Sequence, residues 1–504
     1  MLMSATRHTT KGENMARYTH DAIIIGGGAG GLVTTVGCAQ LGLKTAVVER
    51  QRLGGDCLYH GCVPSKTLLR SAAVYRQAAE FERFGLPSVD MPPVRMADVN
   101  RRVQEVVSEI AQHDAPERFE RLGAEVYSGD PRFMSPHEVE VDGEVISARS
   151  IVIATGSSPR GLPIPGLEEA GYITNLDVFD LAELPRRLVV IGAGPIGSEM
   201  AHAFARLGSA VTVLDVASQV LPREDADMAA IVQQRMEADG VQFKLGAKIA
   251  RVEGGAAAGE PAAGSKRVVL DEDGTETVLE ADELLVAAGR TGNIDRLDLA
   301  KAGVATEKGF ITTNSKLQTS QKHILAVGDV NGRYLFTHVA GAEGSVAVRR
   351  VVFRMGSMNY RSVPWVTYTD PELASIGYNE RSAAEAGIDY HTVHQEISSN
   401  DRAQAEGEPA GMMKVLLDRK DRVIGTQIAA LHAGDLLLPS IFAVGKGWKL
   451  GEVMSPIYPY PTLGEIHKKA ASGYMAPKLF NARVRRLLRA VFRYRGVVEG
   501  HEYH

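Results

Sequence analysis

One glycine-rich pattern occurs twice in the sequence, and this repetition limits the possible folds more than any other feature. In the first copy, an apolar strand predicted at residues 21–25 leads into Gly26, Gly28 and Gly31, and a helix of small residues follows. A second strand then ends at Glu49, 23 residues after the first glycine. Such glycines let the backbone approach a pyrophosphate at a helix N-terminus, and the acid lies where a ribose hydroxyl would be bound.

The second copy begins with the apolar residues 188–191 and continues with Gly192, Gly194 and Gly197. Asp215 again follows the first glycine by 23 residues. The alternative is a pair of tight strand–helix turns without a ligand, but two copies with strand, helix and acid at one offset favour two bound dinucleotides. The two cofactors would be FAD and a nicotinamide, which together form an electron relay.

Two more glycine turns follow apolar strands. One contains Thr155 and Gly156, and the other ends at Asp329. Both are expected at the carboxyl edge of a sheet, where ligands bind in such folds. Residues 254–266, rich in glycine and alanine, are expected to form a surface loop, and the pattern after about residue 360 indicates a separate domain.

The segment between residues 54 and 66 carries two of the three cysteines, Cys57 and Cys62. Pro64 fits the first turn of a helix, so Cys62 is expected at the N-terminal end, where the helix dipole favours a thiolate. Lys66, one turn further on, would also favour negative charge on the sulfur or on a reduced flavin. The pattern therefore favours a redox-active disulfide between the two cysteines.

Half of a zinc site and two buried thiols are the alternatives that remain open for this cysteine pair. A zinc site needs four ligands, and His60 alone does not complete one because the chain has no second cysteine pair. The third cysteine, Cys38, falls on the small-residue face of the first predicted helix and is expected to serve packing. No resident metal is expected.

Composition and charge exclude several classes of protein. The 504 residues suffice for about three domains, and 44% hydrophobic and 23% charged residues are ordinary globular values. The formal net charge of −5 argues against a basic nucleic-acid binder. Because no apolar run is long enough to cross a membrane and the polar N-terminus lacks a signal-peptide core, we expect a soluble cytoplasmic protein in which residues 1–14 are a dispensable extension.

Together these segments resemble the class I family of FAD-dependent pyridine nucleotide-disulfide oxidoreductases, which includes lipoamide dehydrogenase, glutathione reductase and mercuric reductase. The resemblance covers about residues 20–478. The motifs that carry it are GGGAGG at 26–31, GGDCLYHGCVPSK at 54–66, ATGSSP at 154–159, GAGPIGSE at 192–199, AAGR at 287–290, AVGDV at 326–330 and PWVTYTDPELASIG at 364–377.

The resemblance implies an α/β fold with two Rossmann-type nucleotide-binding domains and a C-terminal α+β dimerisation domain, assembled as a homodimer. It predicts an FAD-binding domain at 15–160 and 286–355 and an NAD(P)-binding domain at 161–285. An interface domain would span 360–478, and a basic amphipathic tail would follow at 479–504. In the family, the interface domain lends C-terminal residues to the site of the partner subunit.

The resemblance also implies roles for single residues. NAD(P)H would give hydride to the flavin, which would reduce the disulfide through Cys62, the charge-transfer sulfur. Cys57 would become the interchange thiol that meets the substrate. Lys66 is expected near the reactive flavin nitrogen, paired with Glu199. The expected contacts to FAD also include Glu49 on the ribose, Asp329 on the ribityl chain, and the motif residues Gly55, Thr155, Gly156 and Gly289.

The choice of nicotinamide depends on Asp215. A carboxylate accepts hydrogen bonds from a free 2′-hydroxyl and repels a 2′-phosphate. The next three residues, Val216 to Ser218, offer no arginine, although Arg223 could still reach the site. The sequence therefore favours NADH over NADPH.

The sequence departs from the disulfide reductases of this family near residue 460. Those enzymes carry a His-Pro-Thr segment in which the histidine, oriented by a glutamate, shuttles the thiol proton. Here Tyr460 takes the place of the histidine, and Glu465 lacks the partner that it would orient. His467 is a weak substitute and is expected to be an ordinary helix residue. A phenol with a pKa of about 10 is a poor proton shuttle compared with imidazole at about 6.5.

We therefore place the chain closest to the mercuric-reductase-like group, whose members also carry tyrosine near this point. Hg(II) prefers thiolate ligands and needs no thiol to be reprotonated, so transient Hg(II) binding at Cys57 and Cys62 is expected. Mercuric reductases usually have a second cysteine pair at the C-terminus, whereas this chain has no cysteine after Cys62. The expected acceptor is a metal ion like Hg(II) or a small disulfide.

Residues 479–495 are predicted to form a basic amphipathic helix. Apolar residues recur at helical spacing from Phe480 to Val491, and six arginines occur without one acidic residue. Such a helix can lie on an anionic membrane or on an acidic partner, or it can pack on its own dimer. The first alternative would make the protein peripheral on the inner face of a membrane.

Two further functions remain open. One is a membrane-side diaphorase that reduces quinones at the flavin, which would not require Cys57. The other is a redox-sensing subunit that reports NADH status to a membrane partner. Lipoamide dehydrogenase and glutathione reductase are less favoured because Tyr460 replaces the acid–base histidine.

Overall fold

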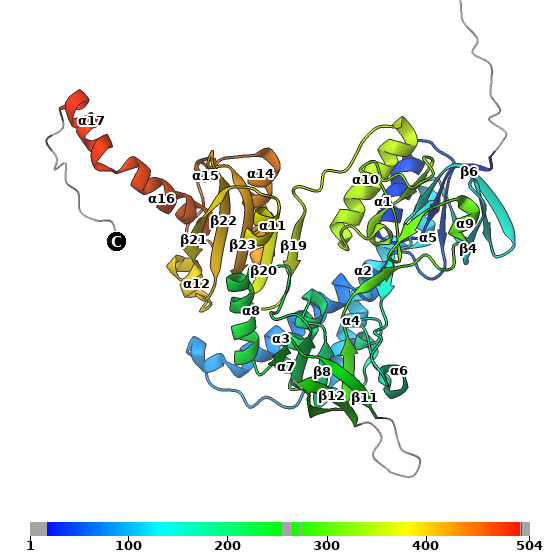
Figure 1. The fold of residues 1–504 in the computed structure, drawn as a ribbon, viewed down its shortest axis with the longest axis horizontal. Coiled ribbons are helices and arrows are strands. Elements are labelled where there is room, and N and C mark those ends of the chain that lie inside the picture. The colour runs from blue at the N-terminus through cyan, green and yellow to red at the C-terminus, as the bar shows by residue number, and fades with distance from the viewer. Residues whose placement is uncertain (1–17, 255–264, 273, 494, 496–504) are drawn as a thin grey trace, which may run out of the picture. The chain divides into compact units, whose positions relative to one another are not determined.

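The computed structural model describes residues 18–254, 265–272, 274–493 and 495, and these residues form two compact units. Figure 1 shows the helices and strands from which each unit is built. The first unit combines residues up to 64 with 104–160 and 289–359, and the second combines 65–103, 161–288 and the residues from 360 onward. The α/β class predicted from the sequence is confirmed, and the predicted domain boundaries stay predictions.

A seven-stranded sheet lies at the centre of the first unit. Its strand order is β3 (Ala124–Ser128), β2 (Thr45–Glu49), β1 (His20–Ile25), β6 (Glu144–Ile153), β5 (Glu138–Val141) and β4 (Pro131–Ser135), and β18 (Ile324–Ala326) pairs with β6. The pairs that join β3, β2, β1, β6 and β18 are parallel, and β4 and β5 add antiparallel pairs. Helix α1 (Ala29–Gln40) connects β1 to β2, as the first glycine pattern predicts.

Both faces of this sheet are covered. Ile23 and Ile25 of β1 belong to one apolar cluster, whereas Ala22 and Ile24 belong to another. Helix α10 (Thr337–Phe353) packs against α1. A parallel sheet that is covered on both sides needs apolar residues at every position, which is why the strand shows a continuous apolar run instead of alternation.

Several further elements complete the first unit, and the long helices α3 and α4 have residues in both units. They are α2 (Gly55–Tyr59), α3 (Cys62–Ala79), α4 (Met96–Ala111), α5 (Pro116–Arg121), β7 (Ser157–Pro159), β15 (Arg290–Gly292), α9 (Leu299–Ala302), β16 (Thr306–Glu307) and β17 (Phe310–Ile311).

The second unit contains three sheets. A parallel sheet has the order β10 (Gln242–Leu245), β9 (Ala210–Asp215), β8 (Arg187–Ile191) and β14 (Glu283–Val286), and α7 (Pro195–Leu207) connects β8 to β9. An antiparallel sheet consists of β11 (Ile249–Glu253), β12 (Lys266–Glu272) and β13 (Thr275–Ala281). The third sheet, also antiparallel, has the order β19 (Pro364–Thr367), β20 (Glu372–Gly377), β23 (Val423–Ala430), β22 (Met412–Asp418) and β21 (Tyr390–Glu396).

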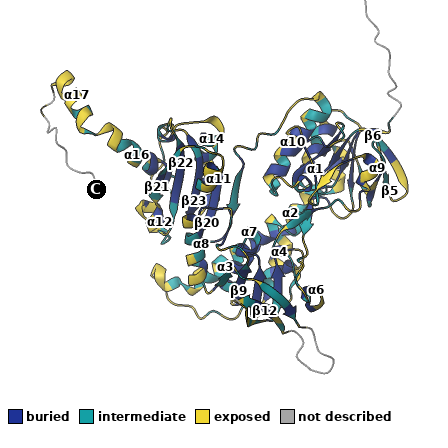
Figure 2. Cartoon of the chain, in the orientation of Figure 1, coloured by how far each residue is buried: buried dark blue, intermediate teal, exposed yellow. Residues whose placement is uncertain are grey.

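The helices of the second unit include one that has no buried residue, α17 (Figure 2). They are α6 (Leu167–Ala170), α8 (Ala226–Ala238), α11 (Glu380–Glu385), α12 (Asp401–Ala405), α13 (Ala433–Leu436), α14 (Leu438–Lys446), α15 (Leu450–Val453), α16 (Glu465–Leu479) and α17 (Ala482–Phe492). Among the described residues, no helix has both the length and the apolar character needed to cross a bilayer. The predicted N-terminal extension and most of the loop predicted at 254–266 lie outside the described residues.

Candidate active site

The loop between β1 and α1 has the geometry of a dinucleotide cradle. Gly26 has a φ of +107°, and a Cβ on it would lie 2.4 Å from the carbonyl oxygen of Ala154. A Cβ on Gly31 would lie 1.9 Å from the carbonyl oxygen of Gly26, so backbone packing requires both glycines. At Gly28, by contrast, the nearest atom to a Cβ would be 3.9 Å away, and that position leaves space beside the N-terminus of α1.

The loop between β8 and α7 repeats this geometry in the second unit. Gly192 has a φ of +118°, and a Cβ on it would lie 2.8 Å from the carbonyl oxygen of Ala287. A Cβ on Gly197 would lie 1.8 Å from the Gly192 oxygen, whereas one on Gly194 would meet no described atom within 4 Å. In both loops the first and third glycines allow helix and strand to pack, and the second leaves room for a ligand.

Neither helix N-terminus is filled by the described part of the chain. Gly28 and Gly194 are the N-caps of α1 and α7, and for both helices the described residues supply no side-chain cap and no acidic residue in the first turn. The free N–H groups and the positive end of the helix dipole are therefore left for an anion. Two such N-termini in one chain fit the pyrophosphates of two dinucleotides.

The two predicted ribose acids occupy equivalent positions. Glu49, at the end of β2, accepts a hydrogen bond from the N–H of Gly27 at 2.7 Å, and Asp215, at the end of β9, accepts one from the N–H of Ala193 at 2.6 Å. Each acid thus holds the residue directly after the first glycine of its loop. Val216, which follows Asp215, is 84% exposed.

The cysteine pair is brought together by a tight turn between α2 and α3. Cys57 lies in α2, Cys62 begins α3, and Gly61 separates the two helices, where a Cβ would come within 3.1 Å of the Cys57 Cα atom. The two sulfur atoms are not bonded to each other in this structure. A hydrogen bond from the Cys57 thiol to the Cys62 sulfur, together with burial, raises the pKa of the Cys57 thiol. The predicted disulfide between them stays a prediction.

Thr337, which sequence reasoning missed, belongs to this group. Its hydroxyl lies 3.4 Å from the Cys62 sulfur and also lowers the pKa of Cys57. Thr337 is the first residue of α10 and lies 275 positions from Cys62. No local pattern connects the two residues, so only the fold could reveal the contact.

Lys66 and Glu199, which the family resemblance pairs, lie together in the second unit. Lys66 is one turn beyond Cys62 on α3, and its Nζ lies 2.6 Å from Glu199 Oε2 and 4.4 Å from the centre of the Tyr368 ring. The other Glu199 oxygen accepts a hydrogen bond from the N–H of Tyr368 at 2.9 Å. The Glu199 side chain is only 6% exposed, and burial of a carboxylate without such partners would be costly. The catalytic role of the pair stays a prediction.

Asp329 lies in a polar group that sequence reasoning found only in part. It accepts a hydrogen bond from Ser157 Oγ at 2.7 Å, and burial raises its pKa. Arg290 donates to Ser157 Oγ at 2.7 Å and to Asp56 at 2.9 Å. Arg290 ends the AAGR motif and Asp56 precedes Cys57, so the motifs contained these residues without indicating their contacts.

Two further glycines, Gly55 and Gly289, and the buried acid Glu343 help to fix the loops around this group. Gly55 has a φ of +65°, and a Cβ on it would lie 2.7 Å from the Cα atom of Gly28, so the cysteine segment packs closely on the first glycine loop. Gly289 has a φ of +107°. Glu343, 1% exposed, accepts hydrogen bonds from the Gly328 N–H at 2.7 Å and from an amide side chain nearby, and thereby holds the loop that carries Asp329.

Thr155 and Gly156 follow β6 at the carboxyl edge of the sheet, as predicted. Thr155 Oγ1 donates to the carbonyl oxygen of Asn293 at 2.8 Å, and Asn293 Nδ2 donates back to the carbonyl oxygen of Thr155 at the same distance. This reciprocal pair ties the end of β6 to the residue that follows β15.

Tyr460, Glu465 and His467 lie in the second unit. Tyr460 is 70% exposed, and its hydroxyl donates to Asp401 at 3.1 Å, which raises the pKa of the phenol. Glu465 begins α16. His467 is 1% exposed and hydrogen-bonds the carbonyl oxygen of Leu436 through Nε2 at 2.6 Å, and burial lowers its pKa to about 4. A buried neutral imidazole is a helix packing residue, so it does not replace the missing histidine.

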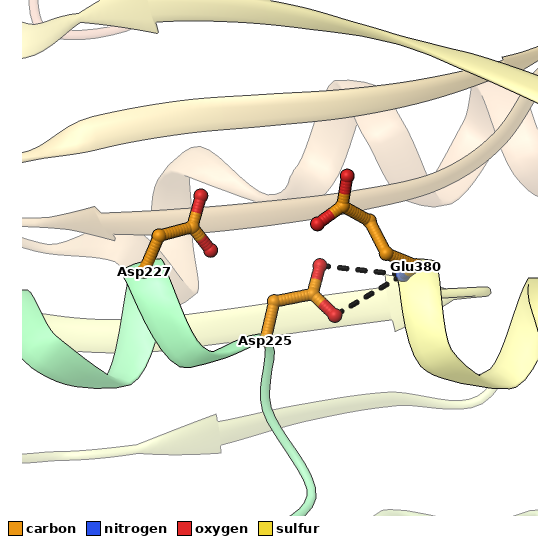
Figure 3. A group of neighbouring side chains, drawn as sticks. All are labelled: Asp225, Asp227 and Glu380. Carbon is orange, nitrogen blue, oxygen red and sulfur yellow. Dashed lines mark hydrogen bonds between the residues drawn. The ribbon is translucent and has the colours of Figure 1, made fainter.

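A separate acidic cluster surrounds a buried lysine. Asp225, Asp227 and Glu380 lie together (Figure 3), and Asp225 also accepts a hydrogen bond from the N–H of Glu380 at 3.1 Å. Lys414 Nζ, whose side chain is fully buried, lies 2.6 Å from Asp227, 3.0 Å from Glu380 and 3.3 Å from Asp225. The ammonium supplies the positive charge that a metal ion would bring, so we interpret the cluster as structural.

Nothing in the described structure supports a zinc site at the cysteine pair. Within the described residues, no group of three metal-ligating side chains contains a cysteine. Cys38 is fully buried, and burial raises its pKa to about 12, as expected for a packing residue.

Comparison with known proteins identifies the class to which this fold and site belong. Residues 20–344 match the family model described as pyridine nucleotide-disulphide oxidoreductase, and residues 363–471 match the dimerisation domain of that family. The chain therefore belongs to the pyridine nucleotide-disulfide oxidoreductase family. It is an FAD-dependent oxidoreductase whose dimerisation domain forms a homodimer.

Relatives that are named for different activities have similar sequence identity to this chain. Leghemoglobin reductase from Glycine max is 35% identical over 468 residues, which cover 90% of this chain and 87% of the relative. Dihydrolipoyl dehydrogenase from Bacillus subtilis (strain 168) is 33% identical over 477 residues, 90% of this chain and 97% of the relative. Mercuric reductase from Bacillus cereus is 32% identical over 456 residues, 90% of this chain and 71% of the relative.

Solved structures agree with the family assignment. The Cu(II) complex of the HOCl-induced flavoprotein disulfide reductase RclA from Escherichia coli superposes with a TM-score of 0.79 at 26% identity and covers 90% of this chain and 99% of that one. LpdA from Mycobacterium tuberculosis gives a TM-score of 0.81 at 25% identity, with 90% and 100% covered. The predicted two nucleotide-binding domains and dimerisation domain are thereby confirmed.

Proposed function

We propose that this chain uses a reduced nicotinamide to reduce the Cys57–Cys62 pair, and that the pair then reduces a thiophilic metal ion such as Hg(II). One observation carries the proposal. Two sulfur atoms lie within hydrogen-bonding distance of each other, while the position of the family's acid–base histidine is taken by Tyr460. This arrangement keeps the electron path and omits the proton shuttle that disulfide substrates need.

Flavin, when bound, would supply the step that converts a hydride from the nicotinamide into two electrons for sulfur. The chain's own groups would do the rest. The N-terminus of α3 favours a thiolate at Cys62, and the Thr337 hydroxyl can donate to the same sulfur. Two thiolates at Cys57 and Cys62 can bind a soft cation, and one pair of electrons converts Hg(II) to Hg(0) while both sulfurs join in a disulfide.

The relatives support a metal acceptor without deciding it. Mercuric reductases from Bacillus cereus and Staphylococcus aureus are each 32% identical to this chain, and the solved RclA is a Cu(II) complex. Dihydrolipoyl dehydrogenases are equally similar, so a small disulfide is the second candidate acceptor. The tyrosine at position 460 favours the metal ion because a phenol of raised pKa is a weak proton donor and acceptor near neutral pH.

We also propose NADH as the preferred nicotinamide. Asp215 lies at the end of β9 beside the second glycine loop, where its carboxylate would accept hydrogen bonds from a 2′-hydroxyl and repel a 2′-phosphate. Arg223 is the arginine that could still reach this site. It is exposed, and its backbone oxygen accepts hydrogen bonds from the Asn379 and Arg381 side chains.

Oxidation of NADH and NADPH by the flavin-loaded homodimer, measured with Hg(II) in excess small thiol, tests the proposal. We expect Hg(II)-dependent turnover that is faster with NADH and is lost in Cys57→Ala, with Cys38→Ala as the matched control because Cys38 is buried packing. If turnover with Hg(II) is absent while a small disulfide is reduced, the metal acceptor is wrong. If both activities persist in Cys57→Ala, the cysteine pair is not on the electron path.

A further inference from the structure

Helix α17 (Ala482–Phe492) sorts its side chains onto two opposite faces. Residues three and four apart share a face of an α-helix, so the sequence of α17 can be assigned directly. The apolar face consists of Val484, Leu487, Leu488 and Val491, and the opposite face carries Arg485, Arg486 and Arg489.

The apolar face of α17 is exposed. No residue of this helix is buried in the described structure (Figure 2). Leu487, Val491 and Phe492 are 63%, 61% and 59% exposed. An isolated helix of 11 residues is marginal in water, because helical stability usually comes from packing an apolar face. A contiguous exposed apolar face of this kind marks an interaction surface.

The chain nevertheless specifies the start of this helix. Asn481 is the N-cap, and its side-chain oxygen accepts a hydrogen bond from the N–H of Val484 at 3.0 Å. Its Nδ2 donates to the carbonyl oxygen of Lys478, near the end of α16. The cap separates α17 from α16 and makes it an element with a defined beginning.

The charge of the segment selects one kind of partner. Residues 479–495 hold six arginines and no acidic residue. A second copy of this helix would bring like charges together, and the matched dimerisation domain ends at residue 471, before α17 begins. An acidic protein surface would satisfy the arginines but would leave the opposite, apolar face in water. An anionic bilayer satisfies both faces, because apolar side chains enter the acyl boundary while arginines extend to the phosphates.

We propose that α17 docks this protein on the surface of an anionic lipid bilayer. The helix would lie parallel to the surface with Leu487 and Val491 facing the acyl chains. Eleven residues extend about 16 Å, which is too short to cross the hydrocarbon core and sufficient for an interfacial anchor. The proposal is independent of the acceptor, because it rests on no residue of the cysteine pair or of the nucleotide loops.

Vesicle sedimentation of the full-length flavin-loaded protein tests this docking. The vesicles contain phosphatidylcholine alone or with about 30% phosphatidylserine, at about 0.15 M salt. We expect binding to the anionic vesicles only, weakened at least tenfold both in Arg486→Glu/Arg489→Glu and in Leu487→Ser/Val491→Ser. Arg95→Glu/Arg101→Glu is the matched control, because it changes the net charge equally at exposed sites on α4 and before it. It is expected to bind as the unchanged protein does.

Three results would overturn the proposal. The first is equal sedimentation of the unchanged protein with both vesicle types. The second is equal weakening by the control variant, which would assign the effect to net charge instead of to α17. The third is dissociation of the homodimer by Leu487→Ser/Val491→Ser in sedimentation velocity, which would show that a second copy covers the apolar face.

Discussion

Single contacts decide the chemistry of the two sulfur atoms. The Cys57 thiol has a raised pKa because it donates a hydrogen bond to the Cys62 sulfur and because it is buried, while the hydroxyl of Thr337 opposes this shift. The sequence indicated the cysteines through their spacing and flanking glycines. It could not indicate Thr337, because a contact across 275 positions depends on how α10 meets the start of α3.

Thr337→Val should slow alkylation of Cys57 in the reduced protein about threefold to tenfold at neutral pH, since a lost hydrogen bond is worth roughly 1 kcal/mol and raises the pKa of the thiol further. Thr337→Ser keeps the hydroxyl and is the matched control. The rate is measured by mass spectrometry of the alkylated peptide. Equal alkylation rates in the two variants would show that the Thr337 hydroxyl does not influence the Cys57 thiol.

His467 gives a pH dependence to stability. Its folded-state pKa of about 4 lies below the usual value because the ring is buried, and its Nδ1 has no hydrogen-bond partner in the described structure. Between about pH 6.5 and 4 the unfolded chain binds a proton here that the folded chain does not. The stability present above pH 6.5 is therefore lost as the pH falls, by about 3 kcal/mol in total.

His467→Gln keeps a side-chain donor for the Leu436 carbonyl oxygen and cannot be protonated. The apparent Tm of the unchanged protein should therefore fall more steeply from pH 7 to pH 4.5 than that of the variant, measured at one scan rate. Parallel curves would mean that His467 stays neutral in the unfolded chain or charged in the folded one.

At the scale of helices and strands, the sequence predicted those elements that a short stretch of residues is sufficient to determine. The two strand–glycine–helix units and the start of α3 at Cys62 follow from patterns within about 30 residues. A helix is predicted at 479–495, and the structure has α17 at Ala482–Phe492, because Leu479 still belongs to α16 and Asn481 caps the new helix. The pairing of β18 with β6 and the reciprocal bonds of Thr155 and Asn293 could not be predicted, because they join segments more than 130 positions apart.

In the glycine loop between β1 and α1, we expect one glycine to serve ligand binding and another to serve folding. Gly28 has an extended backbone and room for a Cβ, so Gly28→Val should fold with an apparent Tm of the apoprotein near that of the unchanged chain and lose most of its flavin. Gly31→Ala should instead destabilise the apoprotein by several degrees, because its Cβ would lie 1.9 Å from a backbone oxygen.

Flavin absorbance relative to protein absorbance and the apparent Tm of the apoprotein are measured on both variants. Equal flavin content in Gly28→Val and in the unchanged protein would contradict the assignment of this loop to the dinucleotide.

At the scale of the whole molecule, the chain carries the sequence motifs of its family and differs from the family's disulfide reductases at position 460. The chain has the nucleotide loops, the cysteine pair and the dimerisation domain of a disulfide oxidoreductase. The exposed Tyr460 belongs to the C-terminal segment that, by family resemblance, serves the site of the partner subunit. This difference explains why the family follows from the sequence while the acceptor has to be proposed.

Tyr460→His should add the missing proton shuttle. We expect turnover with a small disulfide to rise at least about tenfold, with a pH dependence near the ordinary imidazole pKa of about 6.5, because general acid–base catalysis contributes at least this much. Tyr460→Phe is the control of similar size. An unchanged rate in Tyr460→His would show that position 460 is not the place of the acid–base group.

Thiol counting tests the central claim, reduction of a Cys57–Cys62 disulfide by the nicotinamide. The flavin-loaded protein is denatured before or after anaerobic addition of NADH, and its thiols are titrated. With three cysteines in the chain, we predict one thiol before NADH, from Cys38, and three afterwards. Cys57→Ala should show two thiols in both states. A count for the unchanged protein that does not rise with NADH would contradict the account.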